Sequence, residues 1–151
     1  MGRAPKENRI RILFVDDEEN ILLSIKRLLM KEDFDVLTAG SGEEGLEVLK
    51  KNPDVGVVVS DQRMTGMDGV EFLEKAWEVV PDSIRIMLTG YDDTEIARGA
   101  INKGGAYRYI TKPWKNSEFV QALRDAARIF ALARENKRLT RLIRKMNGEL
   151  L

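Results

Sequence analysis

The stretch Val55–Gly69 reads VGVVVSDQRMTGMDG and decides the fold of this chain. It begins with a run rich in valine, reaches the carboxylate of Asp61, and then turns through Gly66 and Gly69. An apolar, β-branched run bounded by turn residues is typical of a strand that is buried on both faces. Such strands belong to parallel sheets that helices cover on both sides. Because ligands bind outside the carboxyl ends of parallel strands, we expect the chemistry of this protein at Asp61.

The composition excludes several kinds of site. The chain has 151 residues and contains neither cysteine nor histidine. Disulfides, thiol nucleophiles, thiolate metal sites, histidine acid–base catalysis and histidine metal ligands are therefore excluded. Lys+Arg and Asp+Glu both number 25, so the net charge gives no general attraction to nucleic acid or to a membrane. No run is as long as a transmembrane helix and the start lacks the apolar core of a signal peptide, which predicts a cytoplasmic protein with a flexible tail at residues 1–8.

The rest of the chain alternates short apolar runs with helical patterns. Strands are predicted at residues 10–15, 35–39, up to 60, 84–88 and 107–111. Helices are predicted at residues 19–31, from 41 to about 52, 69–80, 92–103 and from 116 onward, with Asn116 and Ser117 capping the last one and Trp77 facing the core. Five strands alternating with five helices predict an α/β fold built on a parallel sheet.

Polar side chains follow four of the predicted strands. Asp16 and Asp17 follow the first strand, Asp61 the third, Thr89 the fourth and Lys112 the fifth. Right-handed crossovers place the carboxyl ends of parallel strands along one edge, so we expect these side chains to meet there. Three clustered carboxylates repel one another unless a cation lies among them, and hard oxygen ligands suit Mg²⁺ or Mn²⁺. With a lysine and a hydroxyl to hold phosphoryl oxygens, this set predicts phosphoryl transfer to a carboxylate.

The same residues carry a resemblance to a known family. The chain resembles the receiver domain of two-component response regulators in five motifs that fall in order along it: Asp16-Asp17, Asp61-x-x-Met64, Gly69, Thr89-Gly90 and Tyr109-x-x-Lys112-Pro113. The resemblance covers about residues 9–130. It implies a doubly wound, flavodoxin-like sheet of five strands in the order 2-1-3-4-5, flanked by five helices of which the last is extended.

The resemblance also implies a phosphoacceptor and a metal site. Asp61 would accept a phosphoryl group from a partner histidine kinase. Asp17, Asp61 and the backbone carbonyl of Arg63 would bind Mg²⁺, and Asp16 would act through water. The domain would catalyse its own phosphorylation and dephosphorylation without being an enzyme that turns over a substrate.

A conformational switch is implied as well. Thr89 would move toward the phosphoryl group and Tyr109 would turn inward, reshaping the face formed by the fourth helix, the fifth strand and the fifth helix. Lys112 would sense the phosphate, and its bond to Pro113 would be the family's cis peptide. Thr65 stands where the family usually has proline, which gives this loop more backbone freedom.

Residues 131–151 extend beyond the end of a receiver and predict a helical linker toward an output domain outside this sequence. Apolar residues step by four and three along it, with one polar member in the series: Leu132, Asn136, Leu139, Ile143, Met146 and Leu150. This heptad pattern predicts a homodimer through the last helix. The linker also carries a basic series: Arg134, Lys137, Arg138, Arg141, Arg144 and Lys145. Contact with nucleic acid is an alternative that we do not favour, because the helix lacks the aromatic residues of a DNA reader.

Two other functions compete with the receiver. A phosphohydrolase of the dehalogenase type has a second aspartate two residues after its nucleophile, whereas this chain has Arg63 there. A module that binds or dimerises without phosphorylation has no need of the acidic pair or of Lys112. In the simplest structural alternatives, Asp61 is a solvated carboxylate at the sheet edge and Tyr109 is an ordinary core residue.

Overall fold

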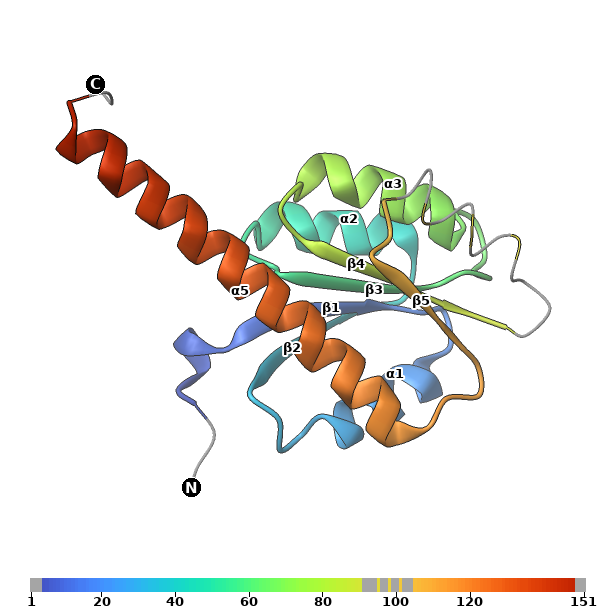
Figure 1. The fold of residues 1–151 in the computed structure, drawn as a ribbon. Helices are drawn as coiled ribbons and strands as arrows, with labels where there is room; N and C mark the ends of the chain where they lie inside the picture. The colour runs from blue at the N-terminus through green and yellow to red at the C-terminus, as the bar shows by residue number, and fades with distance from the viewer. Residues whose placement is uncertain (1–3, 91–94, 96–97, 99–100, 102–104, 149–151) are drawn as a thin grey trace.

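A computed structural model describes residues 4–90, 95, 98, 101 and 105–148 of the chain (Figure 1). It contains a five-stranded parallel sheet in the order β2-β1-β3-β4-β5, which confirms the predicted fold class and strand order. The strands are β1 (Ile10–Val15), β2 (Phe34–Ala39), β3 (Val57–Asp61), β4 (Ile84–Thr89) and β5 (Arg108–Thr111). The short 3-10 helix η1 (Lys6–Asn8) precedes them, and the predicted tail is tied there by a hydrogen bond from the Ala4 amide to Asp33.

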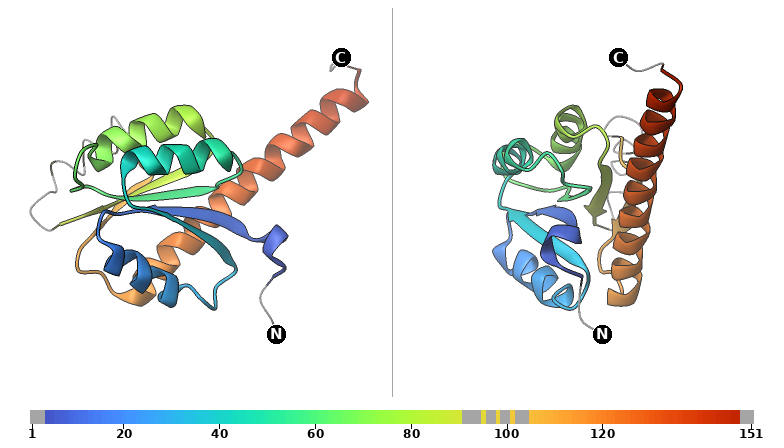
Figure 2. Two further views of the ribbon diagram at one scale, coloured as in Figure 1. Left: turned by 180° about the vertical axis from the view of Figure 1, so that it is seen from behind. Right: turned by 90° about the vertical axis from the view of Figure 1, so that its left-hand side faces the viewer.

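Helices cover both faces of the sheet. α1 (Glu19–Leu28) and α5 (Asn116–Met146) lie on one face, and α2 (Gly42–Lys51) and α3 (Gly69–Val79) lie on the other (Figure 1, Figure 2). The helix predicted at residues 92–103 falls largely outside the described residues. Among the residues that the structure describes, no helix is both long and apolar enough to span a membrane.

β3 lies at the centre of the core. All five residues of β3 are buried, and the strand pairs with β1 on one side and β4 on the other. On the face covered by α1 and α5, Phe14 and Phe119 contact each other, and Trp114 stacks on Phe119 with ring centroids 4.7 Å apart. On the face covered by α2 and α3, Phe72 and other residues of α3 pack against β3 and β4. The buried carboxyl end of β3 thereby holds Asp61 in a fixed position.

Three local predictions are wrong. α1 was expected to reach residue 31 but ends at Leu28, because the backbone then tightens into successive turns. The side chains of Asn116 and Ser117 do not cap α5, since its N-cap residue is Lys115 and no side chain bonds there. Trp77 is 43% exposed, and its ring lies 4.9 Å from the Arg85 guanidinium instead of filling the core.

The last helix is one continuous element that leaves the body of the protein. α5 packs on the sheet up to Phe130 and then runs outward, with its later residues largely exposed (Figure 1). Phe130 is seated over Gly56, where an added Cβ atom would lie 2.5 Å from the phenyl ring. Glycine at this position therefore lets the helix approach the base of β3.

Candidate functional site

Three carboxylates meet at the carboxyl ends of β1 and β3. One oxygen from each of Asp16, Asp17 and Asp61 lies within 4.8 Å of the others. Asp16 and Asp61 are buried, with Asp61 only 7% exposed, whereas Asp17 faces solvent. The structure thus brings together the acidic residues that the strand pattern singled out.

Asp16 has an oxygen without a hydrogen-bond partner. Its Oδ1 accepts a hydrogen bond from the Glu18 amide at 2.9 Å, but its buried Oδ2 accepts none from the described residues. Lys112 Nζ lies 4.0 Å from this Oδ2, which is too far for a hydrogen bond. Burial raises the pKa of Asp16 to about 6, and the nearby Asp61 charge adds to the rise, while the Glu18 amide and Lys112 oppose it. An orphaned buried oxygen facing two other carboxylates fits a hard divalent cation such as Mg²⁺ or Mn²⁺.

Lys112 supplies the positive charge of the site. It follows β5, and its Nζ lies 2.6 Å from Oδ1 of Asp61. The Lys112–Pro113 peptide bond is cis, as the resemblance to the receiver family implied. One ammonium beside three carboxylates leaves an excess of negative charge, which a divalent cation would offset.

The loop after Asp61 is closed by Gln62, a residue whose role was not predicted from the sequence. The Gln62 amide donates to Leu88 O at 3.0 Å, while its backbone carbonyl and its side-chain Oε1 accept from the amides of Gly69 and Val70, each at 3.0 Å. A Cβ on Gly69 would lie 2.8 Å from Gln62 Cα and would also collide with the carbonyl of Asp61. Gln62 and Gly69 therefore hold the start of α3 directly against Asp61. A polar residue immediately after a buried strand was the only signal for this role.

Thr65 ties the same loop to the acidic cluster. Its backbone amide and its Oγ1 both donate to Oδ2 of Asp17, at 2.9 and 3.1 Å. Proline at this position would have neither donor. Arg63 and Thr65 line the same shallow hollow as Asp17, which places the Arg63 residue beside the cluster. Hydrogen bonds to Asp17 thus restrain the loop in place of a proline ring.

Thr89 and Tyr109 lie on the neighbouring strands β4 and β5. Thr89 is fully buried, and its Oγ1 donates a long hydrogen bond of 3.4 Å to the carbonyl of Gly90. Thr89 pairs with Thr111, and Tyr109 pairs with Met87, so Thr89 and Tyr109 are diagonal neighbours on one face of the sheet. Tyr109 is half-buried against the apolar layer beneath α2 and α3. The structure brings the two residues onto one face of the sheet, with Thr89 on β4, the strand next to the one that carries Asp61.

This arrangement has a defined chemical capacity. Asp61 presents a carboxylate that is held from one side by an ammonium and lies beside two further carboxylates. A divalent cation held by these carboxylates would supply positive charge beside Asp61, whose oxygen is the candidate nucleophile. Lys112 and such a cation would offset the negative charge of an incoming phosphoryl group.

Comparison with known proteins points the same way. The family model for the response regulator receiver domain matches residues 12–124. The hydrogenase transcriptional regulatory protein HoxA of Bradyrhizobium diazoefficiens is 36% identical over 126 residues, which are 83% of this chain and 26% of HoxA. This chain spans about a quarter of the length of the curated relatives it matches.

Two solved structures have the same fold. A chain from Rhodopirellula baltica, described as an adenylate cyclase, superposes with a TM-score of 0.82 at 36% identity, over 88% of this chain and 98% of that one. A response regulator receiver domain protein from Clostridium thermocellum gives a TM-score of 0.77 at 34% identity, over 82% of this chain and 98% of that one.

Proposed function

Because the chain belongs to the response regulator receiver family, we propose that it accepts a phosphoryl group on Asp61 from a partner histidine kinase in a Mg²⁺-dependent reaction. The observation that carries this proposal is the joint position of three carboxylates around Asp61, with an unsatisfied buried oxygen on Asp16 and Lys112 bound to the acceptor. Mn²⁺ has the same ligand preference and is expected to substitute.

The residues divide the work of transfer. An oxygen of Asp61 attacks phosphorus, forming the O–P bond while the bond from phosphorus to the donor nitrogen breaks. Asp16, Asp17, Asp61 and the carbonyl of Arg63 would hold the metal ion, which supplies charge neutralisation. Lys112 moves its hydrogen bond from the carboxylate to a phosphoryl oxygen, since the phosphoryl group adds about −1.5 to −2 charge.

The phosphorylated site then acts on Thr89 and Tyr109. Thr89 turns its hydroxyl from the weak bond to Gly90 toward the phosphoryl group, and Tyr109 moves inward on the same face of the sheet. The 3.4 Å length of the present Thr89 hydrogen bond supports this step, because little energy opposes the rotation. Such a change alters the surface of β5 and α5 and thereby controls dimerisation or an output domain.

The intact mass of the protein after incubation with acetyl phosphate tests the proposal. Wild type is expected to gain one phosphoryl group only when Mg²⁺ is present, and Asp61→Asn is expected to gain none. Asp54→Asn is the matched control, since Asp54 is an exposed carboxylate paired with Arg11. No gain in wild type would leave a receiver that binds or dimerises without phosphorylation. Steady release of phosphate from small esters would instead indicate a phosphohydrolase.

The domain organisation follows from the same premise. Residues 9–130 form the receiver, and residues 131–151 lead toward an output domain, as the greater length of the curated relatives supports. The exposed apolar residues of α5 support a homodimer through this helix and its extension: Leu132, Leu139, Ile143 and Met146. We expect no direct binding of nucleic acid by this part of the protein.

A further inference from the structure

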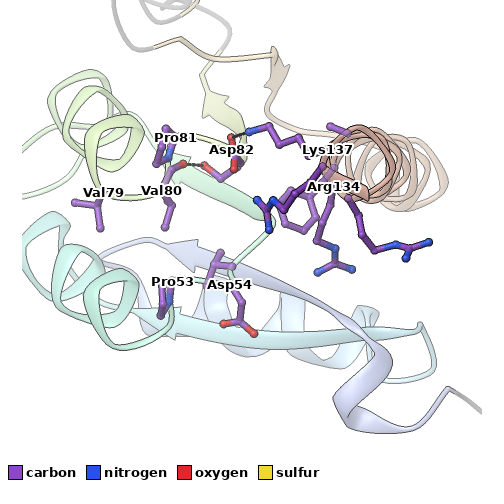
Figure 3. Close-up of a pocket in the computed structure, with 14 residues that line it drawn as sticks. Pro53, Asp54, Val79, Val80, Pro81, Asp82, Arg134 and Lys137 are labelled. Carbon is purple, nitrogen blue, oxygen red and sulfur yellow. Dashed lines mark hydrogen bonds and ion pairs between the residues drawn. The ribbon is translucent and has the colours of Figure 1, made fainter. Parts of the chain in front are cut away.

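A second hollow lies at the opposite end of the sheet from the acidic cluster. It is a pocket of about 460 Å³ beneath the amino ends of β3 and β4, between the turn after α2, the turn after α3 and the outgoing part of α5 (Figure 3). Volumes of roughly 300–1,000 Å³ are typical of sites for small molecules. The receiver chemistry proposed above makes no use of this pocket.

The pocket has an apolar base and a cationic wall. Val55, Val80 and Phe130 are buried residues that contribute apolar surface to it. The wall is formed by the basic residues of α5 that line the pocket: Arg134, Lys137, Arg138 and Arg141. Asp54 and Asp82 lie across from them (Figure 3).

Two of these cations already have carboxylate partners. Lys137 pairs with Asp82. Arg138 makes two hydrogen bonds to Glu135 on its own helix, at 2.7 and 3.0 Å. Asp54, the other acidic residue of the pocket, is paired with Arg11 at 3.2 Å. Asp54, Asp82 and Glu135 are therefore each already paired with a basic side chain.

Arg134 and Arg141 are the two basic residues of the pocket wall that have no salt bridge among the described residues. The Arg134 guanidinium lies 5.1 Å from the centre of the Phe130 ring, and in the described part of the chain it forms no salt bridge. Arg141 likewise has no salt bridge or hydrogen-bonded carboxylate among the described residues. Guanidinium groups bind carboxylate and phosphate oxygens in pairs, so these side chains offer donors at the mouth of an apolar pocket.

The positions of Arg134 and Arg141 around α5 indicate that their guanidinium groups face the pocket. At 100° per residue, Phe130, Arg134 and Arg141 fall within roughly 40° of one another around the helix. Leu139 and Ile143 lie roughly on the opposite side of the helix. The cations thus face the body of the protein while the apolar series faces away, and a ligand and a partner helix have separate surfaces.

We propose that this pocket binds a small organic anion, an apolar body that carries a phosphate or carboxylate group. Its anionic group is held by Arg134 and Arg141, and its apolar body rests on Val55, Val80 and Phe130. Asp54 and Asp82 keep the anionic group on the α5 side through repulsion. Such a ligand would contact both the receiver body and the outgoing helix and would fix their relative position.

Amide chemical shifts of the whole ¹⁵N-labelled chain test the proposal, with phenyl phosphate, benzoate, benzyl alcohol and inorganic phosphate as probes. Phenyl phosphate or benzoate is expected to give saturable shifts at Val55, Ser83 and Ala133, and whichever binds identifies the anionic group as phosphate or carboxylate. The double variant Arg134→Gln/Arg141→Gln is expected to weaken that binding about tenfold or more, because each guanidinium contributes charged hydrogen bonds.

Arg144→Gln is the matched control, since it removes the same charge from α5 outside the pocket and is expected to bind as wild type does. Asp61→Asn is also expected to bind normally, which separates this site from the receiver chemistry. The proposal is overturned by the absence of saturable shifts, by equal losses in Arg144→Gln, or by inorganic phosphate or benzyl alcohol binding as well as the organic anions. Circular dichroism of each variant confirms that the helix is intact.

Discussion

Asp16 combines a buried, unsatisfied oxygen with a pKa raised to about 6 from the usual 3.8, chiefly by burial. In metal-free protein, between about pH 4 and pH 6, the folded state therefore keeps a proton that the unfolded state has lost. The free energy of unfolding consequently falls as pH rises through this window, and above it the cost of the buried charge is fully present. Asp16→Asn is expected to remove this contribution and to stabilise the metal-free protein at pH 7 by about 1–3 kcal/mol.

Urea unfolding in EDTA at several pH values measures this effect as the difference between wild type and Asp16→Asn. Other carboxylates titrate in both proteins and cancel in the difference. Mg²⁺ is expected to stabilise wild type more than the variant. A difference that does not change between pH 4 and pH 7 would show that Asp16 is ionised without cost.

Thr65 is exposed, and its backbone amide and hydroxyl both donate hydrogen bonds to one oxygen of Asp17. Thr65→Val keeps the amide donor and the shape of the side chain but loses the hydroxyl donor. A hydrogen bond of this kind contributes about 0.5–1.5 kcal/mol, so we expect the dissociation constant for Mg²⁺ to rise about two- to tenfold. Calorimetric titration with Mg²⁺ measures it, and Thr140→Val on α5 is the control for the same exchange elsewhere. Equal affinities in all three proteins would mean that Thr65 does not orient Asp17.

At the scale of an element, α5 presents an apolar series that the rest of the chain leaves uncovered. Ile143 is 57% exposed on the side of the helix turned away from the body. Ile143→Asp is expected to abolish dimer formation without destabilising the receiver, because a charge facing a partner helix is poorly tolerated, whereas a charge facing solvent has little effect. Sedimentation equilibrium of phosphorylated and unphosphorylated protein measures the association. Thr140→Asp introduces the same charge beside the series as a control, and a monomeric wild type would exclude this helix as the interface.

The arrangement of strands and helices explains which features of the site could be predicted from the sequence. Asp16, Asp61 and Lys112 follow strands whose parallel order is fixed by right-handed crossovers, so their meeting follows from the pattern of strands and helices. The hydrogen bonds of Gln62 and Thr65 depend on the path of one loop, which no periodicity describes. The pocket beside α5 depends on how that helix lies against the sheet, where Phe130 contacts Gly56, a residue far from it in sequence.

On the scale of the whole molecule, two glycines mark opposite ends of the sheet and allow those ends to be tested separately. At Gly56 an added Cβ would lie 2.5 Å from the Phe130 ring, at the amino end, where α5 is seated. At Gly69 it would collide with the backbone of Asp61 and Gln62, at the carboxyl end. Overpacking of this kind costs about 1–3 kcal/mol, so both alanine variants are expected to be less stable than wild type in urea.

Their functional effects are expected to differ. Gly56→Ala displaces α5 from the base of β3 and is expected to retain Mg²⁺-dependent uptake of a phosphoryl group, because the acidic cluster lies at the other end of the sheet. Gly69→Ala is expected to slow that uptake, because the displaced backbone carries Asp61, the proposed acceptor. The two rates are measured as intact mass against time after addition of acetyl phosphate. The buffer contains no urea, and the temperature is one at which both variants remain folded. If Gly56→Ala slowed phosphorylation as much as Gly69→Ala, the seat of α5 and the acceptor would form one coupled unit, and the position of the outgoing helix would itself control the chemistry at Asp61.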